Sequence, residues 1–199
     1  MAVLKCKMCG GTLEVTNSEK LVTCEFCGTT QTIPLLDNEK RITLHNRANA
    51  FRLRNEFDKA IITYESIVEE FMDDAEAYWG LVLCKYGIEY VDDSITGKKI
   101  PTCHRTLTKN IFDDLDYQNA LKHSDIISKY VYETEAKEID RLQKEIISIS
   151  QKEEPYDIFI CYKETDNLNK RTIGSIIAQE IYEELIRKGY KVFFSRITL

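Results

Sequence analysis

The pattern of apolar and polar positions divides the chain into a short β-rich start, a long helical middle and a C-terminal part with strands. The C-terminal part opens with residues 156–162, an apolar run without helical period that is rich in β-branched and aromatic side chains. Such a run predicts a strand buried on both faces. A helical pattern over residues 172–188, then Gly189 and a second apolar run over residues 190–194 complete the part. We therefore expect a βαβ unit with parallel strands and a right-handed crossover.

The helical middle covers residues 37–150, where apolar side chains recur at steps of three and four residues. This period is typical of amphipathic helices. Asp37 or Asn38 can cap the first of them, and Asp73-Asp74 can cap the third. The predicted helices run from about residue 39 to 53, 59 to 71, 75 to 90, 114 to 124 and 125 to 150.

Part of this middle resembles a tetratricopeptide (TPR) helical hairpin. Small and large residues fall where that repeat packs its two helices together. They are Ala48, Ala60, Tyr64 and Ile67. The match covers about one repeat, and Met72 stands where such repeats usually carry proline. A TPR-like hairpin is our prediction, with a helical spacer and a peptide-binding surface both open as its role.

Residues 92–108 interrupt the helical pattern, and residues 95–101 predict a β-turn or hairpin inserted between helices. Cys103 and His104 follow directly, but no general base or second metal-binding pair accompanies them in the sequence. We interpret them as a packed cysteine and a surface histidine. The lone His45 receives no role.

Four cysteines near the start form two Cys-x-x-Cys-Gly units, with 14 residues between Cys9 and Cys24. Two residues between cysteines let one tight turn direct both thiolates at one ion, and two such turns complete a tetrahedral Zn²⁺ site. Alternating segments at residues 12–16 and 20–23 flank a predicted hairpin turn at 17–19, and residues 31–34 predict a third short strand. The pattern resembles a zinc ribbon over residues 1–36. Its expected ligands are Cys6, Cys9, Cys24 and Cys27.

The alternatives to zinc are disulfides, a redox Cys-x-x-Cys pair or iron. The doubled spacing and a reducing compartment disfavour the first two, and zinc is the commoner structural metal at four thiolates. A unit of 36 residues cannot bury enough apolar surface to fold alone, so metal binding would supply the missing free energy. Lysines and glutamates cancel along the ribbon, which predicts a structural or protein-contacting module.

Composition narrows the function classes. The 199 residues are 43% hydrophobic and 30% charged, which is ordinary for a globular protein. A net charge of −6 argues against nucleic-acid binding, and no apolar run approaches the ~20 residues of a membrane span. Seven cysteines without a signal-peptide core predict a reducing compartment. We expect a soluble cytoplasmic protein whose partners are other proteins, with Cys84 and Cys161 as small buried side chains.

The C-terminal residues carry a further resemblance. Residues 156–162, Tyr-Asp-Ile-Phe-Ile-Cys-Tyr, resemble the first-strand box of a TIR (Toll/interleukin-1 receptor) domain. Residues 177–193 are similar to that family's first helix and second strand, and residues 195–199 would begin the loop after that strand. The resemblance implies a flavodoxin-like α/β fold, of which residues 155–199 are the N-terminal part, cut after the second strand. The expected architecture is multidomain: zinc ribbon, all-α TPR-like middle and the start of a TIR domain, as in bacterial TIR proteins.

The resemblance also implies a candidate substrate, because some TIR domains cleave NAD⁺ at the nicotinamide–ribose bond. Ligands of open parallel sheets bind beyond the carboxyl ends of the strands. The residues there that would contact NAD⁺ are Tyr162, Lys163, Ser195 and Arg196. Bond cleavage develops oxocarbenium character that a carboxylate can stabilise, but the family's catalytic glutamate lies on a later helix. No residue of this chain corresponds to it, and Glu164 and Asp166 are interpreted as a solvated loop, so we assign no catalytic residue and expect the 199-residue chain to be inactive.

Three hypotheses remain open from the sequence. The first is the N-terminal part of a TIR-family signalling or defence protein whose complete form hydrolyses NAD⁺. The second is a non-enzymatic interaction or adaptor module with a structural zinc site, in which a partner or another copy completes the TIR-like segment through TIR–TIR association. The third is a different doubly wound nucleotide-binding domain, which the lack of a glycine-rich phosphate loop after the first strand disfavours.

Overall fold

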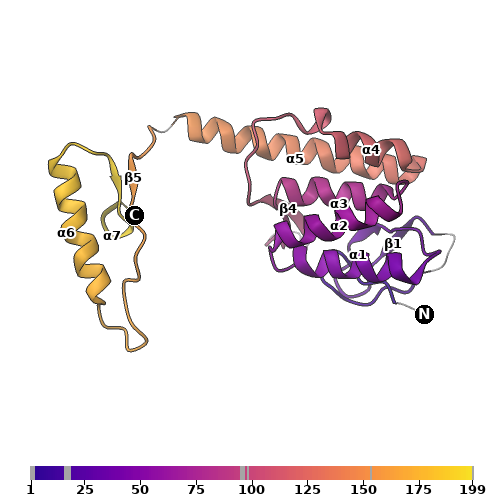
Figure 1. Ribbon diagram of the computed structural model, residues 1–199, viewed down its shortest axis with the longest axis horizontal. Helices are drawn as coiled ribbons and strands as arrows, with labels where there is room; N and C mark the ends of the chain where they lie inside the picture. Colours follow the sequence, from indigo (N-terminus) through magenta and orange to yellow (C-terminus); the bar gives the residue numbers. More distant parts are fainter. Residues whose placement is uncertain (1–2, 16–18, 95–96, 98, 153, 199) are drawn as a thin grey trace. The chain divides into compact units, whose positions relative to one another are not determined.

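The computed structural model describes residues 3–15, 19–94, 97, 99–152 and 154–198 (Figure 1). These residues form a mixed α/β structure with seven α-helices, one short 3-10 helix and three two-stranded sheets. The chain divides into two compact units, Met1–Ile147 and Ser148–Leu199. Among the described residues, no helix has both the length and the apolar character needed to cross a bilayer.

The helices of the first unit lie where the pattern predicted them, with shifted ends at α2 and α3. Helices α1, α2 and α3 lie side by side, and α4 packs on α3 (Figure 1). Asn38 rather than Asp37 caps α1, because its side chain accepts hydrogen bonds from the backbone N–H groups of Lys40 and Arg41. Asp74 caps α3 in the same way through the N–H of Ala77. The bounds are α1 Glu39–Arg52, α2 Phe57–Glu70, α3 Ala75–Lys85, η1 Ile111–Asp113, α4 Leu115–His123 and α5 Ile126–Lys152.

The four residues of the TPR-like pattern lie in one hydrophobic cluster. Ala48 and Ala60 are fully buried, and Tyr64 and Ile67 pack with them between α1, α2 and α3. Gly80 allows α3 to approach α2 closely, since a Cβ at Gly80 would stand 2.4 Å from the Tyr64 ring. A small residue is therefore required where the ring of Tyr64 meets α3.

Helix α3 ends earlier than the sequence predicted. It stops at Lys85 rather than near Tyr90, because Gly87 adopts a left-handed φ of 58° that a helix cannot contain. Strand β3, Ile88–Asp92, follows and pairs antiparallel with β4, Lys99–Cys103. The predicted hairpin is confirmed, with longer strands than expected; residues 95, 96 and 98 of its tip lie outside the described part.

The N-terminal β structure differs from the expected hairpin. Strand β1, Leu21–Thr23, pairs with β2, Thr30–Thr32, and Thr12 bridges to Lys5 instead. The cause is local, because the second Cys-x-x-Cys turn reverses the chain by itself and brings residues 21–23 and 30–32 together. Residues 16–18, which include most of the predicted turn, are outside the described part.

The N-terminal β structure shares a core with the helices. Leu4, Met8, Leu13 and Ile33 form one cluster with Ile42 of α1. The side chain of Asn46, also on α1, accepts a hydrogen bond from the backbone N–H of Lys5 at 2.8 Å. The cysteine-rich segment is therefore packed on the helical part within one compact unit.

The second unit contains the βαβ arrangement. Strands β5, Ile158–Phe159, and β6, Val192–Phe193, pair in parallel, and α6, Ile173–Arg187, connects them. The predicted burial on both faces is wrong for β5: it has two residues, Phe159 is 65% exposed and Cys161 is exposed as well. Residues 195–198 form the short helix α7 rather than a loop. A two-stranded sheet with one helix lacks the second layer that would cover these side chains.

Candidate metal centre

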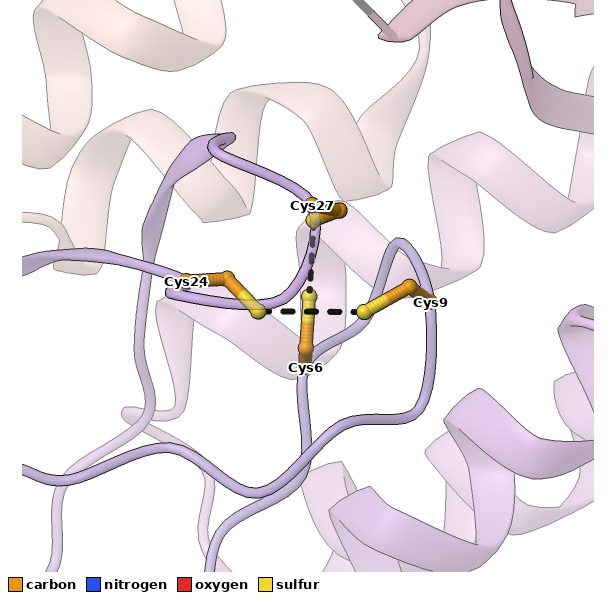
Figure 2. A group of neighbouring side chains, drawn as sticks. All are labelled: Cys6, Cys9, Cys24 and Cys27. Atoms are coloured by element: carbon orange, nitrogen blue, oxygen red, sulfur yellow. Dashed lines mark hydrogen bonds between the residues drawn. The ribbon is translucent and has the colours of Figure 1, made fainter.

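The four cysteines of the two Cys-x-x-Cys turns converge on one point and are called the cysteine cluster below (Figure 2). Their sulfur atoms all lie within 4.8 Å of one another. The Cys6 and Cys27 sulfurs are 3.8 Å apart, and those of Cys9 and Cys24 are 3.7 Å apart. A tetrahedral ion with metal–sulfur bonds of ~2.3 Å separates its ligands by about 3.8 Å. The donor set therefore fits a four-coordinate metal ion, and the separations are far beyond a disulfide bond of ~2.05 Å.

The two turns that present these sulfurs repeat one backbone pattern. In the first, the Gly10 N–H donates to the Cys6 carbonyl at 2.9 Å, and the Cys6 N–H donates to the Gly11 carbonyl at 2.7 Å. In the second, Gly28 donates to the Cys24 carbonyl at 2.8 Å. Gly10 and Gly28 both have positive φ, 78° and 67°, a conformation that glycine adopts at no steric cost. The glycine after each second cysteine thus closes the turn, as the sequence spacing indicated.

Hydrogen bonds to sulfur add to the site. The backbone N–H groups of Met8 and Gly11 point at the sulfurs of Cys6 and Cys9, at 3.3 and 3.5 Å. The Gln31 side chain donates to the Cys6 sulfur at 2.9 Å. Donors around a thiolate disperse its charge and orient it for the metal.

Burial and local hydrogen bonds shift the thiol pKa values of the cluster in different directions. Burial raises the pKa of Cys6, and burial together with the neighbouring thiols raises that of Cys9 to about 12. At Cys27 burial acts in the same direction, but hydrogen bonds from Thr29 outweigh it and lower the pKa to about 7. Two of the thiols therefore resist ionisation, and a bound dication would stabilise them as thiolates.

A buried polar network joins the first turn to the helices. The Lys7 ammonium, between Cys6 and Cys9 in sequence, lies 2.6 Å from Glu76 Oε1 at the start of α3. The other Glu76 oxygen accepts the hydroxyl groups of Thr32 and Tyr132, at 2.6 and 2.7 Å. Arg52 also donates to the Lys7 carbonyl. The first Cys-x-x-Cys turn is thus held by residues of α1, α3 and α5 together.

Sequence reasoning missed the residues of this network. Lys7 and Glu76 receive no role from the sequence, although their side chains are only 5% and 9% exposed. His45, which received no role, is buried with its Nε2 3.0 Å from Asp74 Oδ2. Glu76 sits among the mostly apolar buried residues of α3, and this position is the signal that the sequence carries for it.

Cys103 and His104 stay apart from the cluster. Cys103 is half-buried against the core, and His104 is largely exposed with its Nε2 2.5 Å from Glu89 Oε2. This arrangement agrees with a packed cysteine and a surface histidine.

The residues that the TIR resemblance implies for NAD⁺ lie beyond the carboxyl ends of β5 and β6. The Tyr162 hydroxyl donates to Glu164 at 2.9 Å, and Arg196 lies 3.8 Å from the other Glu164 oxygen. The Tyr162 ring also packs against Phe194, with ring centroids 5.0 Å apart. Lys163 contributes its carbonyl, which accepts the Thr172 hydroxyl, and Ser195 begins α7. The Glu164 carboxylate therefore contacts both the Tyr162 hydroxyl and the Arg196 guanidinium.

The chain was compared with known proteins at three levels. No protein-family model, no curated protein and no solved structure matches it.

Proposed function

We propose that the cysteine cluster binds one structural Zn²⁺ and that residues 1–147 are a zinc-stabilised scaffold for protein–protein contacts. The observation that carries the proposal is the convergence of four sulfurs at the separations of a tetrahedral ion. Four thiolates fill the coordination sphere, whereas a catalytic zinc keeps one position open for water. Cys6 and Cys24 are fully buried, which supports a closed site.

The metal content of the purified chain tests this proposal. We expect one equivalent of zinc per chain by elemental analysis, lost in Cys24→Ser because a buried ligand is removed. The matched control is Cys161→Ser, which changes an exposed cysteine outside the cluster and keeps the zinc. Removing zinc with a strong chelator should lower the unfolding temperature of the wild type, since a structural metal contributes directly to folding. Iron in the purified chain, or a disulfide between the turns, contradicts the proposal.

We also propose that residues 155–199 belong to a TIR-type domain of a signalling or defence protein. The support is the resemblance of residues 156–193, together with parallel pairing of β5 and β6 and the gathering of Tyr162, Glu164 and Arg196 beyond their carboxyl ends. Apolar side chains on α6 and beside it stay exposed, as expected of a surface that another segment or copy covers. They include Phe159, Ile173, Ile176, Ile177 and Ile181.

A nicotinamide-release assay separates an enzyme from an interaction module. We expect the 199-residue chain to release no nicotinamide from NAD⁺, because no residue in it matches the family's catalytic glutamate. Light scattering over a range of concentrations should show self-association that Ile177→Glu weakens, with Glu183→Gln as a control on the same helix. Nicotinamide release would overturn the non-enzymatic assignment, and a monomer at every concentration would overturn self-association.

A further inference from the structure

A cavity of about 380 Å³ lies beside the cysteine cluster in the first unit. Its lining includes Lys7, Arg52 and Lys99, with Glu89 as the acidic residue and Tyr90 as the aromatic one. Cys9 and Leu53 also line it, and both are exposed, so the cavity is reached from solvent. The charges in this wall are predominantly positive in a chain whose net charge is −6.

Arg52 is the feature of this cavity that the fold leaves uncompensated. Its side chain is almost fully buried, with 3% of the residue exposed. The guanidinium donates to two backbone carbonyls, those of Lys7 and Ile88. It also contacts two uncharged aromatic side chains, hydrogen-bonding with Tyr64 and lying 5.6 Å from the ring centroid of Tyr90. Its Nε is buried without a hydrogen-bond partner, and no carboxylate among the described residues pairs with it. A guanidinium stays protonated in proteins, and burying a charge without a counter-charge is energetically unfavourable.

The other charges of the wall have partners. Lys7 is neutralised by Glu76, and Glu89 contacts His104. Lys99 lies 2.9 Å from Asp92, but the Asp92 side chain is 69% exposed. The Lys99 side chain itself is only 15% exposed, and because the aspartate of the pair is largely solvated its hold on the lysine is weak. Lys99, which lines the cavity, can therefore contact a ligand there.

We propose that this cavity binds a small oxyanion, a phosphate group or a carboxylate, with Arg52 and Lys99 as its cationic contacts. Arginine is suited to this task because its planar fork of N–H donors matches the oxygens of both groups. The bound anion supplies the counter-charge that the described residues lack. This anion site is distinct from the proposed structural role of zinc. It would place the bound oxyanion next to Cys9, the exposed cysteine of the cluster.

The alternative to a bound anion is that the thiolates of the cysteine cluster, which borders the cavity through Cys9, offset the charge of Arg52. If they alone satisfy it, the cavity has no affinity for free anions. The two assignments therefore differ in one measurable quantity, which is saturable anion binding by the metal-loaded chain.

The test is a titration of the metal-loaded 199-residue chain with inorganic phosphate and, separately, with acetate. Sodium chloride at matched ionic strength controls for screening. We expect a saturable rise in unfolding temperature and a calorimetric binding isotherm with at least one of the two oxyanions. Phosphate alone would assign phosphate ligands, and acetate alone would assign carboxylate ligands. No saturable binding of either overturns the proposal.

Variants locate the binding in the cavity. Lys99→Gln should weaken oxyanion affinity about tenfold and Glu89→Gln should strengthen it, whereas Lys59→Gln, an exposed lysine that does not line the cavity, should leave it unchanged. Arg52→Lys keeps the charge and removes the planar guanidinium, so it tests the role of its paired N–H donors. If Arg52→Lys does not fold, the affinity of Lys99→Gln decides the result. Equal affinities in wild type and Lys99→Gln contradict the site. Metal content is measured on the same samples, so failure of the zinc assignment is recognised separately.

Discussion

Lys7 and Glu76 form a buried ion pair, 2.6 Å between Nζ and Oε1, that joins the first Cys-x-x-Cys turn to helix α3. The two residues are 69 positions apart in the sequence. Lys7 lies inside the Cys-x-x-Cys turn, so any shift of Glu76 acts on residues that neighbour two of the cysteines. The hydrophobic cluster joins the cysteine-rich segment to α1, and the ion pair adds a direct polar contact between the first Cys-x-x-Cys turn and α3.

Breaking this pair should destabilise the first unit strongly. Lys7→Met leaves the Glu76 carboxylate buried without its cation, for which we expect a loss of about 3–5 kcal/mol in the free energy of unfolding. Urea denaturation of the metal-loaded chain measures it. Lys40→Met is the control, because Lys40 pairs with Glu70 at the surface and should cost less than about 1 kcal/mol. The double variant Lys7→Met/Glu76→Gln should lose less than the sum of the single changes; strictly additive losses would show that the pair is not coupled.

Gln31 should affect metal affinity more than stability of the helices. Its side chain donates to the Cys6 sulfur at 2.9 Å and accepts the Lys7 N–H at 2.9 Å. Gln31→Ala removes both contacts, and we expect zinc affinity to fall about 10–100-fold, as for other residues that orient a metal ligand. Competition with a chromophoric chelator measures the affinity. Gln118→Ala, at an exposed position on α4, should leave it unchanged, and unaltered affinity in Gln31→Ala would contradict the role.

Asp74 should make the first unit sensitive to acid. Burial would raise the pKa of its carboxyl, but His45, the Ala77 N–H and Arg41 outweigh burial and the pKa lies below the ordinary value. The unfolded chain therefore takes up protons first as pH falls. The stabilisation is complete above the unfolded pKa of about 3.9 and is lost as pH falls through the lower folded pKa.

Asp74→Asn tests this dependence while keeping a side-chain oxygen to cap α3. We expect a loss of about 1.5–3 kcal/mol at neutral pH, the range for hydrogen bonds to charged groups, and convergence with the wild type in acid. Unfolding by urea at a series of pH values from 7 to 3 measures both. Asp73→Asn changes the exposed neighbouring residue and should leave the dependence of the unfolding free energy on pH unchanged. A constant difference at all pH values would contradict the assignment.

Gly80 should be intolerant of a side chain. A Cβ there would stand 2.4 Å from the Tyr64 ring, so Gly80→Ala should destabilise the first unit by about 1–3 kcal/mol through overpacking. Thermal unfolding measures the change. Gly174→Ala in α6 meets its nearest atom at 3.5 Å and should be neutral or stabilising by up to about 1 kcal/mol. Equal effects of the two changes would show that α2 and α3 do not approach as closely as described.

Features with a short-range cause were predictable from the residues alone. Helix α1 follows from its apolar period and a predicted cap, and α2 and α5 follow from their apolar period alone. The two cysteine turns follow from the Cys-x-x-Cys-Gly spacings. These features depend on residues within a few positions of one another, so their pattern is visible along the chain. One of the errors also has a local cause, because the left-handed conformation of Gly87 ends α3 at Lys85 and the longer apolar stripe obscured it.

Long-range pairing was not predictable in the same way. Lys7 and Glu76, His45 and Asp74, and the approach of Gly80 to Tyr64 join residues that are far apart in the chain. A charged side chain looks identical in a sequence whether it faces water or a buried partner, because its burial depends on how the helices pack. The four cysteine ligands are therefore a property of local spacing. The polar network that anchors them, and the uncompensated charge of Arg52, arise only when the packed helices exclude water from those groups.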